Sequence, residues 1–313
     1  MLSYIFRRFM VTIITVIGAM ILLFIFIQLL PGDPVSNLVG PRASEAVIQT
    51  FRERMMLDRP VYVQLGTFLL NVLRGDLGVD VLNHVPVSRL IMINLPHTIL
   101  LATSSIFFAC LLGIPLGVYA AAYRNTLADK ILGVISISLI SLPAFLAGLF
   151  ALLIFSLNLR WFPMMGAGES GNILDQLYHL ALPTFSLALG WIGYIARIMR
   201  ASVLEELTQY YVRTARSKGL AEWVVIYKHV IRTSIIPVVC VVGLGFGTLL
   251  GGAVLIEIIF SRPGLGNLIY RAIETRNFPV VQGGLIIAVF LYSLANLLAD
   301  LSYGFINPRL RSE

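Results

Sequence analysis

The chain alternates long apolar stretches with shorter polar segments, a pattern typical of a protein that crosses a membrane several times. A spanning helix needs about 20 mostly apolar residues to cross the hydrocarbon core. Six stretches meet this requirement, which predicts an all-α fold: a polytopic membrane protein with six transmembrane helices. The expected spans are approximately Phe9–Leu30, Thr98–Tyr123, Ile131–Leu157, Leu177–Ile198, Ile235–Phe260 and Val281–Ile306.

The first stretch follows Arg7 and Arg8, as the core of a signal peptide would. It is longer than a typical signal core, and it ends in Leu-Leu-Pro-Gly-Asp-Pro rather than at a small-residue cleavage site. We therefore expect a retained span. The predicted organisation is a first helix over 1–30, an external loop subdomain over 31–97, a five-helix core over 98–306 and a tail over 307–313.

The placement of Lys and Arg predicts the orientation. Outside the long first loop, these residues gather in the loops on the side of the N-terminus, and few lie on the other side. Because basic loops stay in the cytoplasm, we expect both termini to be cytoplasmic. The same bias accounts for a sequence pI near 9.6 without a nucleic-acid partner.

The external loop carries its own helical pattern. Ser44–Met56 places apolar residues on one stripe of a helix, and Pro60 suits the first turn of a second helix that Gly75 would end. The second helix would present Leu65, Phe68, Leu69 and Val72 on one face. This subdomain either docks a soluble partner or plugs the outer mouth of the bundle, and the pattern favours neither.

The long cytoplasmic loop, residues 199–234, is also patterned. Leu204–Ser217 contains no helix breaker, and Gly219 follows it, where a left-handed residue commonly closes a helix. A second helical stretch, Ala221–Ile231, comes next. The expected motif is helix, glycine turn, helix. Its alternative is a plain basic loop without a partner.

Small and polar residues inside the spans are the remaining candidates. Gly243, Gly247 and Gly251 recur every fourth residue, so we expect close helix packing there rather than solute contact. Pro115, Pro143 and Pro183 are candidate kinks.

Ser293, Asn296 and Asp300 share one face of the last span, where they would line a pathway or bond between helices. We expect Asp300 to pair with Arg197 or Arg200. For Glu257, near the outer end of the fifth span, we expect a structural or gating role.

Composition supports a membrane protein and excludes several chemistries. Residues are 58% hydrophobic and only 12% charged, with a mean hydropathy of +0.88. Cys110 and Cys240 lie in apolar stretches without metal-site spacing. No phosphate-binding GxxxxGK[ST] loop occurs, and the four histidines are scattered. We therefore expect no catalytic, cofactor or metal site in this chain.

The cytoplasmic loop resembles a known motif. Tyr211-Val-Arg-Thr-Ala-Arg-Ser-Lys-Gly219, followed by His229-Val-Ile-Arg-Thr-Ser-Ile-Ile-Pro237, is similar to the EAA loop of ABC importer permeases of the dipeptide, oligopeptide and nickel class. The similarity extends over nearly the whole chain, with two departures. Tyr210 lies where the family has an acidic residue, and Arg262 lies where the family usually has an aromatic one. Further matching segments are Leu30-Pro-Gly-Asp-Pro34, Gly75-Asp-Leu-Gly78, Pro86-Val87, Leu95-Pro96, Phe260-Ser-Arg-Pro-Gly-Leu-Gly266 and Tyr303-Gly-Phe-Ile-Asn-Pro308.

The resemblance implies that the loop is a coupling helix seated in a cleft of a cytosolic ATPase subunit. Gly219 would set the turn, Ala215 would allow close packing, and the basic residues would make polar contacts. The implied coupling residues are Tyr211, Arg213, Thr214, Ala215, Arg216, Lys218 and Gly219.

The implied partners are a second homologous permease, two ATPase subunits that hold ATP and Mg, a periplasmic solute-binding protein and the lipid bilayer. The resemblance favours short peptides as cargo, with glutathione, nickel chelates or opines as alternatives. A secondary transporter would need paired intramembrane acids and discontinuous helices, which the sequence does not show.

Overall fold

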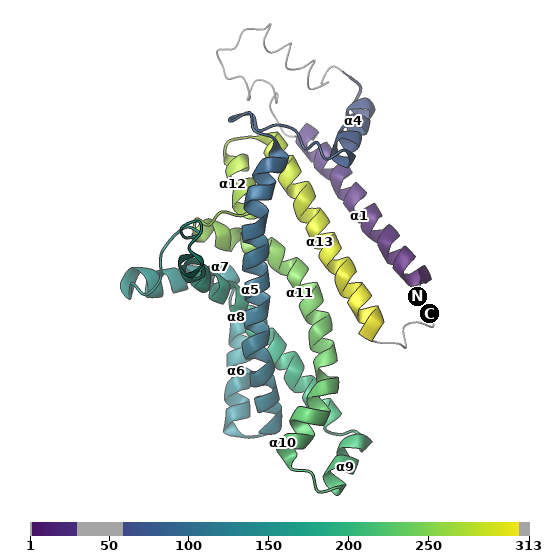
Figure 1. Cartoon of the computed structure of the whole chain (residues 1–313), viewed down its shortest axis with the longest axis vertical. Coiled ribbons are helices and arrows are strands. Elements are labelled where there is room, and N and C mark those ends of the chain that lie inside the picture. The colour runs from purple at the N-terminus through teal and green to yellow at the C-terminus, as the bar shows by residue number, and fades with distance from the viewer. Residues whose placement is uncertain (1, 30–58, 307–313) are drawn as a thin grey trace.

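The computed structural model describes residues 2–29 and 59–306, which are helical apart from turns, loops and one isolated bridge between Val79 and Pro86 (Figure 1). The predicted helix Ser44–Met56 and the tail 307–313 lie outside these residues. The elements are α1 (Leu2–Leu29), α4 (Val61–Leu73), α5 (Val87–Ala122), α6 (Leu127–Ser141), α7 (Ala144–Ala151), η1 (Leu152–Asn158), α8 (Ile173–Glu206), α9 (Tyr210–Ser217), α10 (Glu222–Val224), η2 (Val225–Val230), α11 (Ile231–Ile259), α12 (Leu265–Glu274) and α13 (Phe278–Ile306).

Among the described residues, five helices are long and apolar enough to cross a membrane. The expected third span is not straight: α6 and the α7–η1 segment meet at 98°, so they count as a sixth span only if the bent pair is taken as one. Pro143 precedes α7, and Leu142 before it is extended, because a proline disfavours helical backbone at the preceding residue. The predicted kink at Pro143 is therefore confirmed. Pro115 and Pro183 lie inside continuous helices.

The central helices approach one another at glycines. A Cβ at Gly117 of α5 would lie 2.5 Å from the carbonyl oxygen of Ala196 in α8, and a Cβ at Gly193 of α8 would lie 2.5 Å from the carbonyl of Ser136 in α6. Small residues allow this approach, which van der Waals packing requires where lipid provides no hydrophobic driving force between helices. The resulting block of α5, α6 and α8 forms the centre of the bundle.

The first helix lies at the edge of the bundle, against α13 and α4 (Figure 1). Arg8 of α1 forms an ion pair with Asp300 of α13, at 2.7 Å. The expected pairing of Asp300 with Arg197 or Arg200 is therefore wrong, because the end of α13 packs along α1. Arg200 instead binds Asp129 through two hydrogen bonds of 2.6 and 2.8 Å.

The outer segments connect the ends of several helices. Gly75, with a φ of +80°, follows α4 as predicted, while Pro60 precedes the first turn rather than lying within it. α5 begins at Val87, well before the expected Thr98.

In the loop between α4 and α5, buried Asp80 accepts hydrogen bonds from the Leu82 amide and from the side chains of Asn83 and Asn277, which joins this loop to the start of α13. Burial raises the pKa of Asp80, but these hydrogen bonds lower it to a value below the ordinary one.

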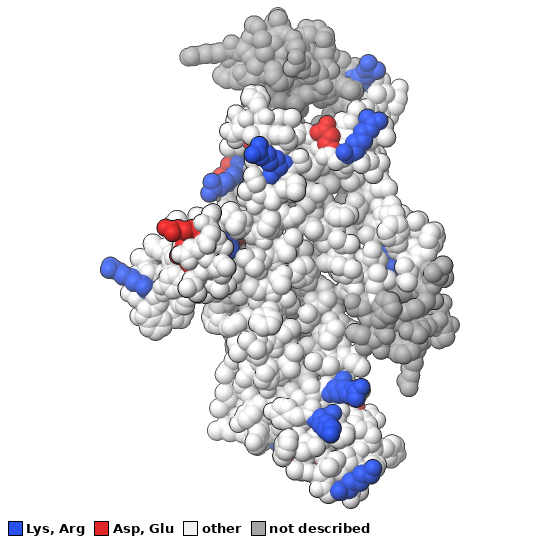
Figure 2. All heavy atoms as spheres, viewed as in Figure 1, with Lys and Arg blue, Asp and Glu red and all other residues white. Residues whose placement is uncertain are grey.

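The surface charges agree with a membrane-embedded middle. Figure 2 shows most Lys and Arg of this face in its upper and lower parts, with a mostly uncharged stretch above the lower group and one cation projecting at mid-height on the left. Apolar side chains on α6, among them Leu127, Ile131 and Val134, are exposed, as expected for a helix that faces lipid.

The glycine stripe of α11 is packed at only two of its three positions within this chain. A Cβ at Gly243 would lie 2.8 Å from the Ala299 side chain of α13, and one at Gly247 would approach Tyr292 and Asn296. Gly251 has no neighbour within 4 Å of such a Cβ.

This contrast predicts opposite effects of one substitution. Gly243→Ala should destabilise the isolated chain by about 1–3 kcal/mol through overpacking against α13. Gly251→Ala should be neutral or stabilise it by up to about 1 kcal/mol, since alanine favours a helix more than glycine. Thermal unfolding in detergent measures both, and equal midpoints for the two variants would contradict the packing described.

Candidate coupling site

The segment between α8 and α11, residues 207–230 and here called the Gly219 arm, extends from one end of the bundle (Figure 1). The expected single helix Leu204–Ser217 is wrong, because α8 ends at Glu206 and α9 begins at Tyr210. The Thr208 hydroxyl donates to the Glu205 carbonyl, and Gln209 is extended. Side-chain hydrogen bonds of this kind compete with helical backbone bonds, and the chain changes direction here.

Gly219 ends α9 with a φ of +75°. Its amide donates to the Arg216 carbonyl, at 2.9 Å. This is the left-handed closure that glycine adopts without strain. A Cβ here would meet nothing within 4 Å, so the backbone angle, and not a lack of space, is what requires glycine.

The inner face of α9 packs on its own chain. Val212 and Ala215 are buried in one cluster with Val203 of α8 and with Val225 and Val230 of η2. Ala215 is therefore buried against its own chain. This packing fixes α9 to the end of α8 and to η2.

Two polar contacts brace the arm. Arg216 binds Glu222 across the glycine turn, with hydrogen bonds of 3.1 and 2.5 Å. The Tyr211 hydroxyl donates to the Glu206 carboxylate at 2.6 Å. The bond to Glu222 raises the pKa of Arg216, and burial together with the Glu206 carboxylate raises the pKa of Tyr211. Arg216 is thus occupied within the chain rather than presented to solvent alone.

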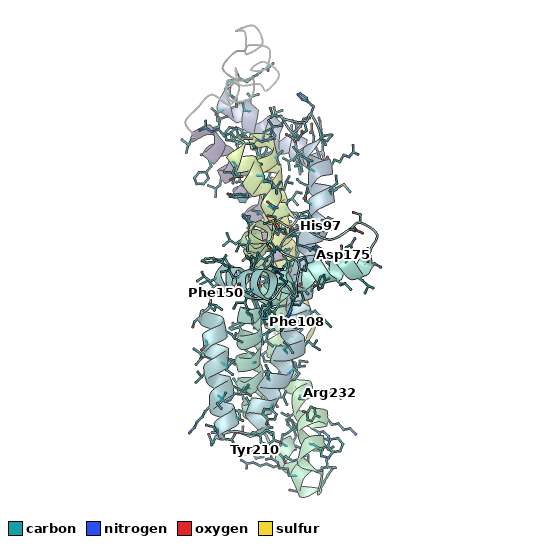
Figure 3. The ribbon with its side chains drawn as sticks, turned by 90° about the vertical axis from the view of Figure 1, so that its left-hand side faces the viewer. His97, Phe108, Phe150, Asp175, Tyr210 and Arg232 are labelled. Atoms are coloured by element: carbon teal, nitrogen blue, oxygen red, sulfur yellow. The ribbon has the colours of Figure 1, made fainter. Side chains whose placement is uncertain are left out.

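The outer face of the arm is aromatic and basic. Tyr210, Trp223 and Tyr227 are 83%, 69% and 66% exposed, and the Arg213 guanidinium lies 5.7 Å from the centre of the Tyr210 ring. Thr214 of α9 and Lys218, which follows it, are also exposed. Figure 3 shows Tyr210 near the lower end of the molecule, far from His97. Exposed aromatic side chains with arginine are typical of protein interfaces.

Sequence reasoning missed Trp223 and Tyr227. The available signal was their i, i+4 spacing in the second stretch of the loop, which places both on one helical face.

Glu257 joins three helices at the opposite end of the bundle. It is 1% exposed, accepts a 2.5 Å hydrogen bond from the Thr98 hydroxyl of α5 and a 3.0 Å bond from the Asn267 amide in the first turn of α12. Thr98 in turn accepts from the Leu265 amide. The carboxylate therefore caps α12, where the helix dipole favours an anion. The sequence did not predict α12.

Arg262 is buried next to this cap, also at 1% exposure. Its Nε and Nη1 atoms have no hydrogen-bond partner within the described part of the chain. Burial lowers the pKa of Arg262, and the Glu257 carboxylate counteracts this effect. This is the position where the resemblance implied an aromatic side chain.

The polar face of α13 is not one cluster. Ser293 is buried, with a hydroxyl that has no partner among the described residues, Asn296 lies beside Gly247, and Asp300 binds Arg8. None of the three lies among the contacts of Glu257. No group of three or more metal-ligating side chains occurs in residues 2–29 and 59–306.

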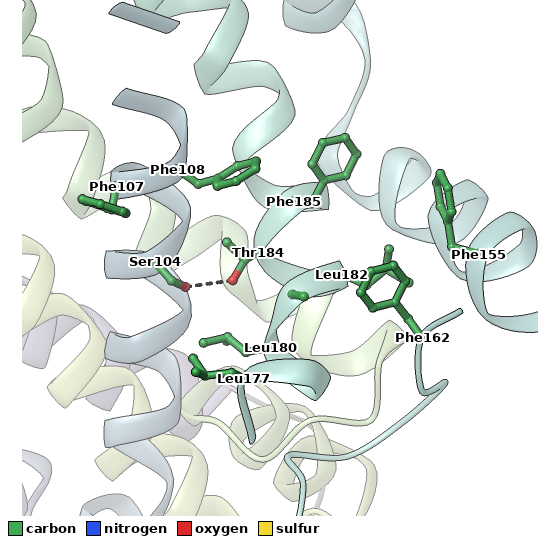
Figure 4. Close-up of a pocket in the computed structure, with 11 residues that line it drawn as sticks. Ser104, Phe107, Phe108, Phe155, Phe162, Leu177, Leu180, Leu182, Thr184 and Phe185 are labelled. Atoms are coloured by element: carbon green, nitrogen blue, oxygen red, sulfur yellow. Dashed lines mark hydrogen bonds between the residues drawn. The ribbon is translucent and has the colours of Figure 1, made fainter. Parts of the chain in front are cut away.

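A cavity of about 470 Å³ lies between α5, α8 and η1 (Figure 4). Its lining is apolar and aromatic, with Phe107, Phe108 and Phe185 among its residues. The Ser104 and Thr184 hydroxyls bond each other at 2.8 Å, so they leave little polar capacity for a solute.

Comparison with known proteins gives the family. The model described as the binding-protein-dependent transport system inner membrane component matches residues 113–312, and its N-terminal companion matches residues 1–102. The chain belongs to this permease family. It is thus an inner-membrane permease of an ABC importer, a transport protein rather than an enzyme, as the resemblance implied.

Relatives and solved structures agree with the assignment. The glutathione transport system permease protein GsiC of Shigella flexneri is 37% identical over 311 residues, or 99% of each protein, and that of Pectobacterium atrosepticum is 38% identical over the same length and coverage. A structure of the inward-facing methionine ABC transporter MetNI aligns with a TM-score of 0.59 and 18% identity, over 70% of this chain and 96% of that one. The similarity to MetNI concerns the fold alone.

The Arg216–Glu222 contact predicts a charge-swap result. Arg216→Glu should leave the permease folded, because an exposed ion pair contributes about 0–1 kcal/mol, but it should lower uptake by placing two carboxylates across the glycine turn. Adding Glu222→Arg should restore uptake. If Arg216 instead contacts a partner protein directly, the double variant will remain as defective as the single one.

Proposed function

We propose that this permease forms half of the solute pathway of an importer for short peptides, and that the Gly219 arm transmits force from a separate ATPase subunit. The observation that carries the proposal is the construction of the arm: a helix braced on its inner face, with an exposed aromatic and basic outer face at one end of the bundle. A braced arm can move the bundle, because little of its displacement is absorbed by local bending.

The connections of the arm support this role. On one side only three residues separate α9 from α8, and on the other side Glu222–Ile259 is one helical span. Reversing a 1:99 conformational equilibrium to 99:1 requires about 5.5 kcal/mol of differential binding. A pair of ATPase subunits that closes on ATP and Mg would provide this free energy through the arm.

The proposed assembly contains a second homologous permease, two cytosolic ATPase subunits and a periplasmic solute-binding protein. The distribution of Lys and Arg supports an orientation with both termini and the Gly219 arm in the cytoplasm. Under this orientation Tyr210, Trp223 and Tyr227 face the ATPase, and Arg213 and Lys218 supply polar contacts to it. α4 then lies on the outer side, where it either docks the binding protein or closes the outer mouth of the bundle.

Glutathione is the second candidate cargo, since the relatives that match 99% of the chain carry it in their names. Glutathione is itself a tripeptide, so both candidates share peptide-bond and carboxylate chemistry. Uptake of labelled dipeptides, tripeptides and glutathione by cells that lack other importers would distinguish them. Competition by one class against the other identifies the preferred cargo, and uptake of neither would contradict both.

Gly219→Val should abolish most ATP-dependent uptake without preventing membrane insertion. A β-branched residue in left-handed backbone costs at least about 1–2 kcal/mol, which disfavours the turn that holds α9 against η2. Gly171→Val is the matched control, because Gly171 also has a positive φ and open space around its Cβ but lies in the loop before α8. Normal uptake by Gly219→Val would refute the coupling role.

The outer face of the arm should cross-link to an ATPase subunit. In a background with Cys110 and Cys240 replaced by alanine, Trp223→Cys and Tyr210→Cys, each labelled with a short photoactivatable maleimide, should cross-link to that subunit in membranes on illumination. Gly171→Cys, at the other end of α8, should not. If both arm variants stay unlinked in an assembly that hydrolyses ATP, the arm has another partner.

A further inference from the structure

A second, basic pocket lies at the end of the bundle that carries the Gly219 arm. It has a volume of about 320 Å³ and lies between the last turns of α5, the first turns of α6 and the last turns of α8. Its cationic side chains are Lys130, Arg197 and Arg200, and its apolar wall includes Leu116, Leu132 and Ile137.

The charges of this pocket do not cancel. The only acidic side chain in its lining is Asp129, whose two oxygens accept three hydrogen bonds, two from Arg200 and one from the Asn125 amide. Neither the Lys130 ammonium nor the Arg197 guanidinium forms an ion pair or hydrogen bond with any other described residue. Arg124 lies close enough to Asp129 to add a further positive charge nearby. The pocket therefore presents two unneutralised cations.

The pocket opens along its apolar wall. Leu116 of α5 and Ile137 of α6, which both line it, are 37% and 55% exposed. The turn between α5 and α6 lies at the same end of the molecule as α9 (Figure 1). Cations above an apolar wall at this depth match the arrangement of a phospholipid, with its phosphate at the surface and its acyl chains below.

We propose that this pocket binds the headgroup phosphate of an anionic phospholipid, with Lys130 and Arg197 as the principal ligands. The phosphate accepts hydrogen bonds from both side chains, while Arg200 remains bound to Asp129 and holds α6 against α8. Gly133 provides room, because a Cβ there would meet no atom within 4 Å. The apolar wall favours a lipid over free inorganic phosphate, which would gain nothing from Leu116 or Ile137.

The test measures lipid retained by the purified permease complex in nanodiscs of phosphatidylcholine and phosphatidylglycerol, by native mass spectrometry. Wild type should retain phosphatidylglycerol in preference to phosphatidylcholine. The double variant Lys130→Gln/Arg197→Gln should bind it about 25-fold more weakly, at about fivefold for each charge removed. Gly133→Leu keeps every charge but fills the pocket, and should also lose the lipid. Lys228→Gln/Arg232→Gln, on η2 and α11, removes the same charge elsewhere and should have no effect.

Four results would overturn the proposal: equal retention of both lipids, equal phosphatidylglycerol binding by pocket and control variants, full displacement of the lipid by inorganic phosphate, or cross-linking of Gly133→Cys to a second permease that covers the pocket. None of these depends on the Gly219 arm, so the lipid site and the coupling role are tested separately.

Discussion

The close approach of three helix backbones at Gly113, Gly117 and Gly193 is the constraint on which the rest of the structure depends. Gly113 and Gly117 bring α5 against α8, and Gly193 brings α8 against α6. In lipid, apolar side chains gain little from leaving their surroundings, so close packing and polar contacts must hold helices together. The resulting block carries each functional feature at a defined place. α8 leads into the Gly219 arm, α5 contributes Thr98 to the cap of α12, and all three helices line the basic pocket.

The transmembrane helices could be predicted because the length of an apolar run is set by the thickness of the bilayer. The 98° bend after α6 was only partly predictable: a proline marks a weak point, but the direction of the chain beyond it is decided by packing against α8. α12 was missed because a helix of ten residues outside the membrane has no such length requirement. The partner of Asp300 could not be deduced either, since pairing depends on which helix lies beside α13.

In the candidate site, too, the features with a local cause could be predicted and those set by tertiary packing could not. A glycine after a helical run predicted the turn at Gly219 correctly, because that turn has a local backbone cause. The surroundings of Ala215 and Arg216 are tertiary: one packs on η2 and the other binds Glu222, which motif spacing alone does not reveal. The exposed residues Trp223 and Tyr227 lay outside the recognised segment. Their exposure becomes evident only once Val225 and Val230 are known to face inward.

The helical continuity of Glu222–Ile259 has a mechanical consequence. At about 1.5 Å per residue this span is roughly 57 Å long, and it begins within the arm and ends two residues beyond Glu257. Under the proposed orientation it would act as a single rod between the two membrane surfaces. A tilt imposed by the arm at the Glu222 end would appear at the Ile259 end as a displacement of the carboxylate that caps α12. The events on the two sides of the bilayer would then be simultaneous rather than relayed through successive local changes.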